Sequence, residues 1–235
     1  MQLILRAKFT KENYLKYISH LDTMRLFQRA FRIADIPIKY SEGFNPHPKF
    51  SIGSALSLGI SSEGEYMDIE LEEKMSVEKF IERMNKALPD NMRIVKGKYV
   101  DGSSSISSII SWAFYNISFE LENGLTHEKV QSEIEKILSL DEIIVKKEKR
   151  KKGRIYEKEE NIREQIGNLN FKDLKARKIE IEALLKTGDS GNLKPIDFLK
   201  ALEKYTDIRI IYDTVKIHRI ELYSEKDNKI ESPLV

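Results

Sequence analysis

The sequence of 235 residues contains no cysteine, one tryptophan and six prolines, and its 40 Lys and Arg are nearly balanced by 38 Asp and Glu. The absence of cysteine excludes disulfide bonds, thiolate metal sites, a catalytic cysteine and an iron–sulfur cluster held by thiolates of this chain. The formal net charge of +2 does not by itself indicate a polyanionic ligand. Any anion-binding surface must therefore come from local clustering of charges.

The chain also lacks an apolar run long enough to span a bilayer. No signal peptide is evident, because the N-terminal segment becomes charged at Arg6. We therefore expect a cytoplasmic protein with no membrane partner. With 40% hydrophobic residues, the chain can bury substantial cores, and its length suits one large or two small domains.

Apolar periodicity and helix caps predict two successive runs of strand, helix, strand, strand, helix, strand. In the first run the expected strands are 3–9, 38–40 with 50–58, 65–72 and 92–100, and the expected helices are 19–35 and 76–88. In the second run the expected strands are 112–121, 142–148, 178–186 and 208–223, and the expected helices are 126–140 and 195–205. This order predicts an α+β fold of two tandem ferredoxin-like (βαββαβ) domains.

The expected domain boundaries follow from these runs and from changes in composition. They are a domain at 1–100, a Ser-rich linker at 101–111, a domain at 112–225 with a basic insertion at 146–177, and a tail at 226–235. Residues 187–192 resemble a phosphate loop only superficially, since they lack the Walker spacing. We interpret them as a turn before the helix at 195–205.

Three arginines lie on one face of the helix expected to begin after Ser19, a typical N-cap that Asp22 can complete as a capping box. The spacing of Arg25, Arg29 and Arg32 puts their guanidinium groups on that face. The apolar stripe expected opposite them consists of Leu21, Met24, Phe27, Ala30, Phe31 and Ala34. Such a face can bind phosphates. Alternatively, it is a solvated helix face in which Asp22 pairs with Arg25.

A loop rich in glycine and proline follows this helix and reads Gly-Phe-Asn-Pro-His-Pro-Lys at residues 43–49. Two prolines restrict the backbone, so we expect a stiff loop that presents side chains for binding. The candidate ligand-binding residues here are Tyr40, Phe44, Asn45, His47 and Lys49. An exposed Phe44 can stack on a base, as in readers of single-stranded RNA. Alternatively, Phe44 and Phe50 pin the loop to the core.

A basic run at residues 146–154 is a further candidate ligand-binding segment, with seven positive charges against one negative charge. Its candidate residues are Lys149, Arg150, Lys151, Lys152 and Arg154. Such a run attracts RNA or another polyanion. Alternatively, it is a charged hairpin whose charge is offset by Glu157, Glu159 and Glu160.

His20, in the first turn of the arginine helix, is the one candidate catalytic residue. A histidine there can act as a general acid or base, although the sequence shows no evident partner for it. By analogy of fold alone, a tandem ferredoxin-like protein with such a histidine resembles the CRISPR repeat-processing endoribonucleases. The alternative is a structural histidine.

We predict no metal site. His20 and His47 have no identifiable third ligand. Three acidic residues of one expected strand face, Asp68, Glu70 and Glu72, can in principle bind Mg²⁺. In the predicted sheet, however, Arg6 and Lys8 of the neighbouring strand face these acids, so cross-strand ion pairs are the better interpretation.

The first 70 residues carry a specific resemblance to a known family. The residues concerned are Ile18-Ser19-His20-Leu21-Asp22, Arg25, Arg29-Ala30, Arg32, the segment from Tyr40 to Pro48, Gly64-Glu65-Tyr66 and, further on, the helix at Pro195. With these the chain resembles the radical SAM-linked protein family, a domain of unknown function found fused to or encoded beside B12-binding radical SAM enzymes. The resemblance implies a radical SAM enzyme as a partner in trans, and it supplies no catalytic residues and no cofactor on this chain.

Three functional hypotheses follow. The first is a non-catalytic accessory protein that binds RNA, such as tRNA or rRNA, or presents a substrate to a radical SAM enzyme that modifies it. The second is a docking module whose Arg25, Arg29 and Arg32 contact carboxylates of that enzyme without binding RNA. The third is a metal-independent endoribonuclease that uses His20.

Overall fold

The computed structural model describes residues 2–151, 154–189, 191–227 and 229–234, and within 147–156 it describes the backbone alone. The protein has an α+β fold with a large mixed sheet and few helices, which confirms the expected class. Contacts divide the chain into two compact units, residues 1–112 with 218–235 and residues 113–217. This division differs from the expected one, because residues 218–235 join the first unit. Residues 101–111, expected to be a linker, also belong there and contain the short helix α3 (Ile106–Ile109).

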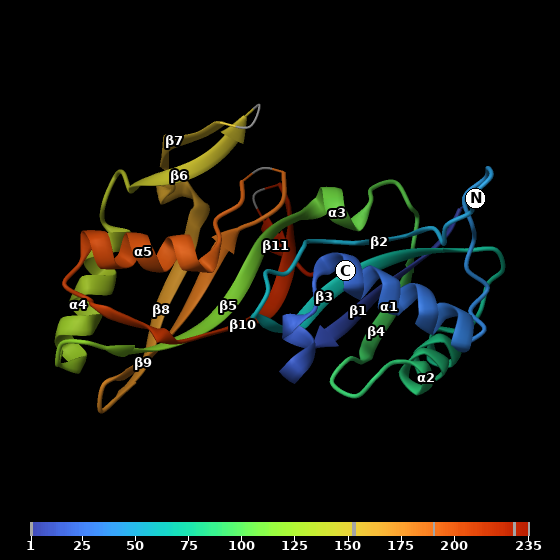
Figure 1. Ribbon diagram of the computed structural model, residues 1–235, viewed down its shortest axis with the longest axis horizontal. Helices are drawn as coiled ribbons and strands as arrows, with labels where there is room; N and C mark the ends of the chain where they lie inside the picture. Colours follow the sequence, from blue (N-terminus) through green and yellow to red (C-terminus); the bar gives the residue numbers. More distant parts are fainter. Residues whose placement is uncertain (1, 152–153, 190, 228, 235) are drawn as a thin grey trace. The chain divides into compact units, whose positions relative to one another are not determined.

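The first unit follows the order strand, helix, two strands, helix, strand. Its elements are β1 (Leu3–Lys11), η1 (Asn13–Tyr17), α1 (His20–Ile33), β2 (Phe50–Ile52), β3 (Ser61–Leu71), α2 (Val77–Ala87) and β4 (Ile94–Val100). Strand β1 lies between β3 and β4 and is antiparallel to both (Figure 1). On its other edge, β3 pairs with the short β2. It also pairs in parallel with His218 and Arg219 of β10 (Ile210–Lys226), the first residues of that strand that belong to this unit. Strand β11 (Lys229–Glu231) pairs with the end of β10.

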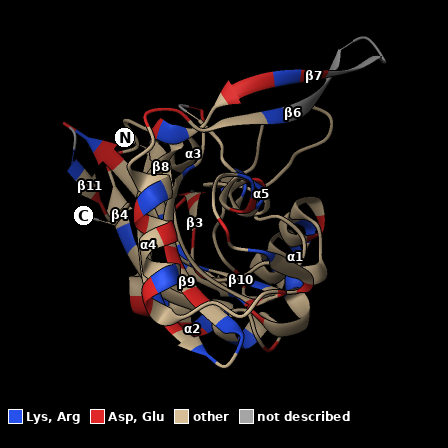
Figure 2. Ribbon diagram, turned by 90° about the vertical axis from the view of Figure 1, so that its left-hand side faces the viewer, with Lys and Arg blue, Asp and Glu red and all other residues tan. Residues whose placement is uncertain are grey.

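The second unit repeats this order with an inserted hairpin. Its elements are β5 (Ile110–Leu121), α4 (His127–Leu138), β6 (Ile144–Lys151), β7 (Arg154–Asn161), η2 (Arg163–Gln165), β8 (Ile166–Lys175), β9 (Lys178–Lys186), α5 (Pro195–Tyr205) and the first part of β10. The strand order is β10–β5–β9–β8, while β6 and β7 pair only with each other among the described residues. Basic and acidic residues are interspersed along α4 (Figure 2).

This topology corrects the expected strands of the second half. The segment 142–148, expected to be a strand of the main sheet, instead begins the β6–β7 hairpin. The insertion expected at 146–177 is shorter, because β8 pairs with β9 within that range. Strand β8 is the last strand in the sheet order, and its pairing with β9 has register shifts. It buries few residues, so the alternation of apolar and polar residues along its sequence is weak.

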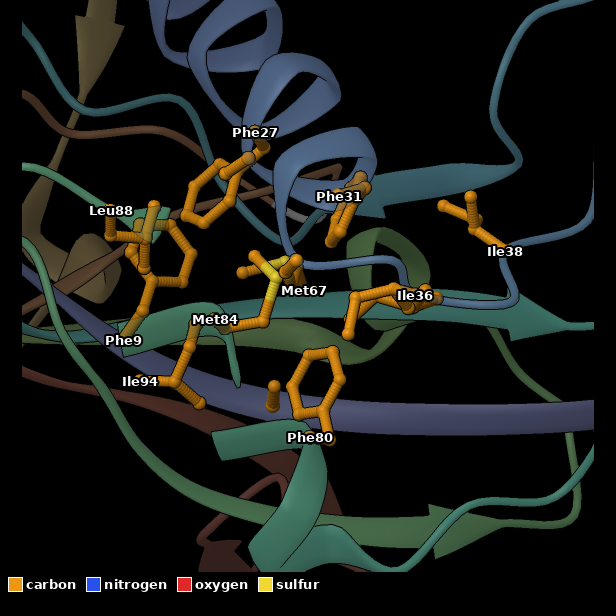
Figure 3. Close-up of a cluster of buried hydrophobic side chains, with 14 of the residues drawn as sticks. Phe9, Phe27, Phe31, Ile36, Ile38, Met67, Phe80, Met84, Leu88 and Ile94 are labelled. Carbon is orange, nitrogen blue, oxygen red and sulfur yellow. The ribbon is translucent and has the colours of Figure 1, made fainter. Parts of the chain in front are cut away.

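The hydrophobic core of the first unit lies between the sheet and the two long helices. Alternate residues of β1 and β3 point toward α1 and α2, and the labelled core residues converge there (Figure 3): Phe9, Phe27, Phe31, Ile36, Ile38, Met67, Phe80, Met84, Leu88 and Ile94. The rings of Phe9 and Phe27 meet edge to face with their centroids 4.9 Å apart. Burial of each large apolar side chain contributes about 1.5–3 kcal/mol, so this packing determines which face of α1 points outward.

No helix in the described part of the chain is long and apolar enough to cross a membrane.

Candidate functional site

Helix α1 begins with a reciprocal cap that also engages one of the three arginines. The Ser19 hydroxyl accepts a hydrogen bond from the Asp22 N–H at 3.1 Å and donates one to the Asp22 carboxylate at 2.6 Å. The same carboxylate accepts a hydrogen bond from Arg25 Nη1 at 3.1 Å. The hydrogen bond from the Ser19 hydroxyl is the main reason why the pKa of Asp22 is lowered, and the bond from Arg25 lowers it further. Arg25 therefore has the intrahelical partner that the solvated-face interpretation required.

The two other arginines of α1 are differently placed. Arg29 and Arg32 are exposed, and neither forms an ion pair with another described residue. Phe27, Ala30 and Phe31 hold the opposite side of the helix in the core. Two guanidinium groups are thus free to meet an anion.

Leu21 was expected in the apolar stripe, but 57% of its surface is exposed. Thr23 is the buried residue of the first turn, and its hydroxyl donates to the Ser19 carbonyl at 2.9 Å. Two residues apart on a helix of 3.6 residues per turn, the two side chains point to nearly opposite sides.

An apolar groove of about 360 Å³ lies between α1 and the end of α2. Its lining residues are Leu26, Arg29, Ala30, Ile33, Ala87, Leu88 and Pro89. Ile33 at its edge is 60% exposed. Arg29 thus stands next to an apolar surface as well as next to solvent.

The loop rich in glycine and proline at residues 43–49 (the Gly-Pro loop) is part of a hairpin whose two arms are joined by hydrogen bonds. The Ser41 N–H donates to the His47 carbonyl, and the His47 N–H donates to the Ser41 hydroxyl, both at 2.9 Å. Lower down, the Lys49 N–H donates to the Lys39 carbonyl at 2.7 Å. The tip from 42 to 46 lies beyond these ties, and Gly43 has φ of 117° there, a value that favours glycine.

The tip presents Phe44 completely to solvent, with a relative exposure of 112%. Asn45 and His47 are also exposed, and Tyr40 is 39% exposed. The interpretation that Phe44 pins the loop to the core is therefore wrong. Only Phe50 does so, with its ring edge to face against Phe31 at a centroid distance of 5.1 Å.

Lys49, expected to be presented by the loop, instead belongs to an ion-pair cluster at the loop base. Its ammonium lies 3.5 Å from one carboxylate oxygen of Glu70, and the ammonium of Lys39 lies 2.8 Å from the other. The hydrogen bond from Lys39 is the main reason why the pKa of Glu70 is lowered, and the same bond raises the pKa of Lys39. Beside this cluster, a pocket of about 340 Å³ is lined in part by Phe50, Ser51 and Ser104.

Two of the three acidic residues of the expected strand face, Asp68 and Glu70, form ion pairs. Asp68 lies opposite Arg6 and accepts two hydrogen bonds from its guanidinium, at 2.7 and 2.9 Å, and a third from the Ile106 N–H at 2.7 Å. Lys8, expected to face these acids, instead lies opposite Tyr66 and pairs with Glu221 of β10 at 2.6 Å. No group of three His, Asp or Glu side chains among the described residues is arranged to hold a metal ion.

His20 is exposed at the start of α1, and no described side chain forms a hydrogen bond or ion pair with its ring. Of the basic run, Lys152 lies outside the described residues. The side chains of Lys149, Arg150, Lys151 and Arg154 lie outside them too, and the backbone places these four residues in the β6–β7 hairpin.

The sequence did not indicate two sets of polar contacts in the first unit. The Ser61 hydroxyl lies 2.8 Å from His218 Nδ1, and His218 Nε2 lies 3.8 Å from the Glu63 carboxylate. In the interior, Arg219 lies 3.3 Å from Glu65, and each side chain is only 2% exposed. The partners come from β3 and β10, so no local spacing in the sequence could have revealed them.

Comparison with known proteins gives one family and a fold. A family model described as "Uncharacterized protein conserved in bacteria (DUF2344)" matches residues 5–195. No curated protein matches the chain. A chain in a structure titled "Crystal Structure of a Cbf5-Nop10-Gar1 Complex" is similar with a TM-score of 0.51 and 8% identity, over 93% of this chain and 48% of that chain. This chain thus spans about half of that one, and the likeness concerns the fold alone.

Proposed function

We propose that this chain, which belongs to the DUF2344 family of uncharacterized proteins conserved in bacteria, is a non-catalytic accessory protein that binds RNA for a radical SAM enzyme acting in trans. The exposure of Phe44 carries the proposal. A phenylalanine with no contact to the core, held at the tip of a hairpin tied by backbone bonds, contributes nothing to folding that a polar residue could not. Its ring is available to stack on an unpaired base.

The arginines of α1 supply the second element of an RNA-binding surface. Phe50 packs on Phe31, so the base of the loop lies beside the C-terminal half of α1, where Arg32 is exposed. Arg29 and Arg32 lack ion pairs among the described residues, so neither must leave a carboxylate to contact a phosphate. Arginine contacts to phosphate provide affinity without sequence preference, and a stacked base adds to it.

The enzyme partner is proposed from the resemblance of the sequence to radical SAM-linked proteins. A chain without cysteine cannot hold the cluster of such an enzyme by thiolates, so the two activities would be divided between two polypeptides in the cytoplasm. We also propose that the two units are duplicated ferredoxin-like folds. The equivalent orders β4–β1–β3–β2 and β10–β5–β9–β8 support this.

A docking module without RNA binding is the second candidate function. The groove beside Arg29 favours it, since an apolar groove with a cation at its edge suits a segment of a partner protein that carries an apolar anchor and a carboxylate.

Crosslinking and pull-down from cells, with and without nuclease, distinguish the candidates. The accessory function predicts a discrete RNA that is recovered with the wild type and lost with an Arg29→Glu/Arg32→Glu variant. Recovery of a radical SAM enzyme without RNA, regardless of nuclease, would support the docking module instead. Cleavage of the recovered RNA that disappears in a His20→Ala variant would replace both with an endoribonuclease.

A further inference from the structure

A cleft in the second unit combines an apolar floor with a rim of lysines. It lies between β6 and α5 and has a volume of about 340 Å³, within the usual range of small-molecule sites. Val145 and Ala201 are buried at its floor. Lys146, Lys200 and Lys204 are exposed around it. None of these residues belongs to the surface of α1 and the Gly-Pro loop.

Hydrogen bonds join the two walls of the cleft, β6 and α5. The Lys204 ammonium donates a hydrogen bond to the Ile144 carbonyl at 2.9 Å. The Tyr205 hydroxyl accepts from the Ile144 N–H at 2.8 Å and donates to the same residue's carbonyl at 3.1 Å. The backbone of β6 is therefore attached to the last turn of α5. Lys200 and Lys204, four residues apart on the helix, share the face that borders the cleft.

The charge of the lining is predominantly positive. Asp197 is the one acidic residue among the described residues of the lining, and it lies in the first turn of α5, where the helix dipole favours a carboxylate. Lys146 pairs with Glu157 at 3.1 Å, but both side chains are more than 60% exposed, so this pair is weak. Lys200 has no ion pair among the described residues. Lys204 uses one of its three donors on the Ile144 carbonyl.

An apolar floor with several ammonium groups at its edge suits a ligand that has a flat, weakly polar part and an anionic part. We propose that this cleft binds a nucleotide of RNA, with the phosphate on Lys146 and Lys200 and the base or ribose against Val145 and Ala201. The inference rests on the proposed RNA-binding function and adds to it a nucleotide site in the second unit. Lys146 of this site belongs to the basic run at 146–154, whereas Val145, Lys200 and Ala201 were not indicated by the sequence.

Titration of the ¹⁵N-labelled full chain with uridine 5′-monophosphate tests the site directly. We expect amide shifts concentrated at 144–146 and 197–204, with uridine as the control that lacks phosphate. Lys200→Glu should weaken the affinity about tenfold, the loss of one charge-assisted hydrogen bond. Lys178→Glu, an equal change of charge at an exposed position of β9, should leave it unchanged. Circular dichroism establishes that both variants fold.

Absence of shifts in this region at millimolar nucleotide, or equal effects of the two variants, would overturn the nucleotide site. A parallel titration with an RNA oligonucleotide separates this outcome from failure of the proposed function. Shifts in α1 and the Gly-Pro loop without shifts in α5 would leave RNA binding standing and reject only the cleft. Shifts in α5 with the mononucleotide, but none in α1 or the Gly-Pro loop with RNA, would support the nucleotide site and reject RNA binding by α1 and the loop.

Discussion

Replacement of Phe44 and of Phe50 by alanine should separate binding from folding in the first unit. Phe44 is fully exposed, so Phe44→Ala removes no buried surface and should change the free energy of unfolding by less than about 0.5 kcal/mol. Phe50 is half-buried and packs on Phe31 at 5.1 Å. A fully buried phenylalanine costs about 3–5 kcal/mol when truncated, so we expect about 2 kcal/mol for Phe50→Ala.

The affinity for RNA should fall more in Phe44→Ala than in Phe50→Ala, the reverse of the order expected for stability. Stacking of a base on an aromatic side chain is worth about 1–3 kcal/mol, so Phe44→Ala should weaken the affinity for single-stranded RNA by about 5- to 150-fold. Urea denaturation and fluorescence anisotropy with a labelled oligouridine, on the same preparations, measure the two effects. A loss of stability above about 1 kcal/mol in Phe44→Ala, or unchanged affinity, would refute this account of the loop tip.

Three further predictions concern the stability of the first unit. Asp68→Ala leaves a buried guanidinium without its carboxylate and should lower the free energy of unfolding in urea by about 3–5 kcal/mol, whereas a loss below about 1 kcal/mol would show that the pair is dispensable. Gly64→Ala would place a Cβ atom 2.5 Å from Glu221 Cα, so its thermal midpoint should fall by several degrees, and an unchanged midpoint would contradict this contact. Because Lys39 lowers the pKa of Glu70, the contribution of this carboxylate is present above the unfolded pKa of about 4.3 and lost as pH falls through the folded pKa. Glu70→Gln should therefore lower the free energy of unfolding at pH 7 but not at a pH below the folded pKa of Glu70. If the free energies of unfolding of the wild type and the variant fell in parallel as pH is lowered, this linkage would be disproved.

The elements near the N-terminus could be predicted because local signals agree there. Ser19 marks the start of α1, and the alternation of Leu5, Ala7 and Phe9 identifies the buried face of β1. Propensity, periodicity and capping all indicate the same structure. Strand β8 lacked such agreement, since an edge strand with few buried residues leaves a weak pattern.

The charged residues of the candidate site were harder to predict, because their roles depend on partners distant in sequence. Arg25 pairs with Asp22 within one helical turn, a contact that the spacing of the two residues in the sequence can indicate. Lys49 pairs with Glu70, and Arg219 with Glu65, only because strands bring them together. A run of sequence cannot show whether a cation is paired, and this decides which cations are available for a ligand.

The salt dependence of RNA binding tests the central claim most directly. For single-stranded RNA, the slope of log affinity against log salt should be reduced by roughly 0.7 for each phosphate contact removed, so roughly 1.4 for Arg29→Gln/Arg32→Gln. Arg83→Gln is the matched control on α2, because Arg83 already pairs with Asp35. The account predicts binding at low salt, the reduced slope in the double variant and an unchanged slope in the control. No binding of the wild type at low salt, or equal slopes in all three proteins, would contradict it.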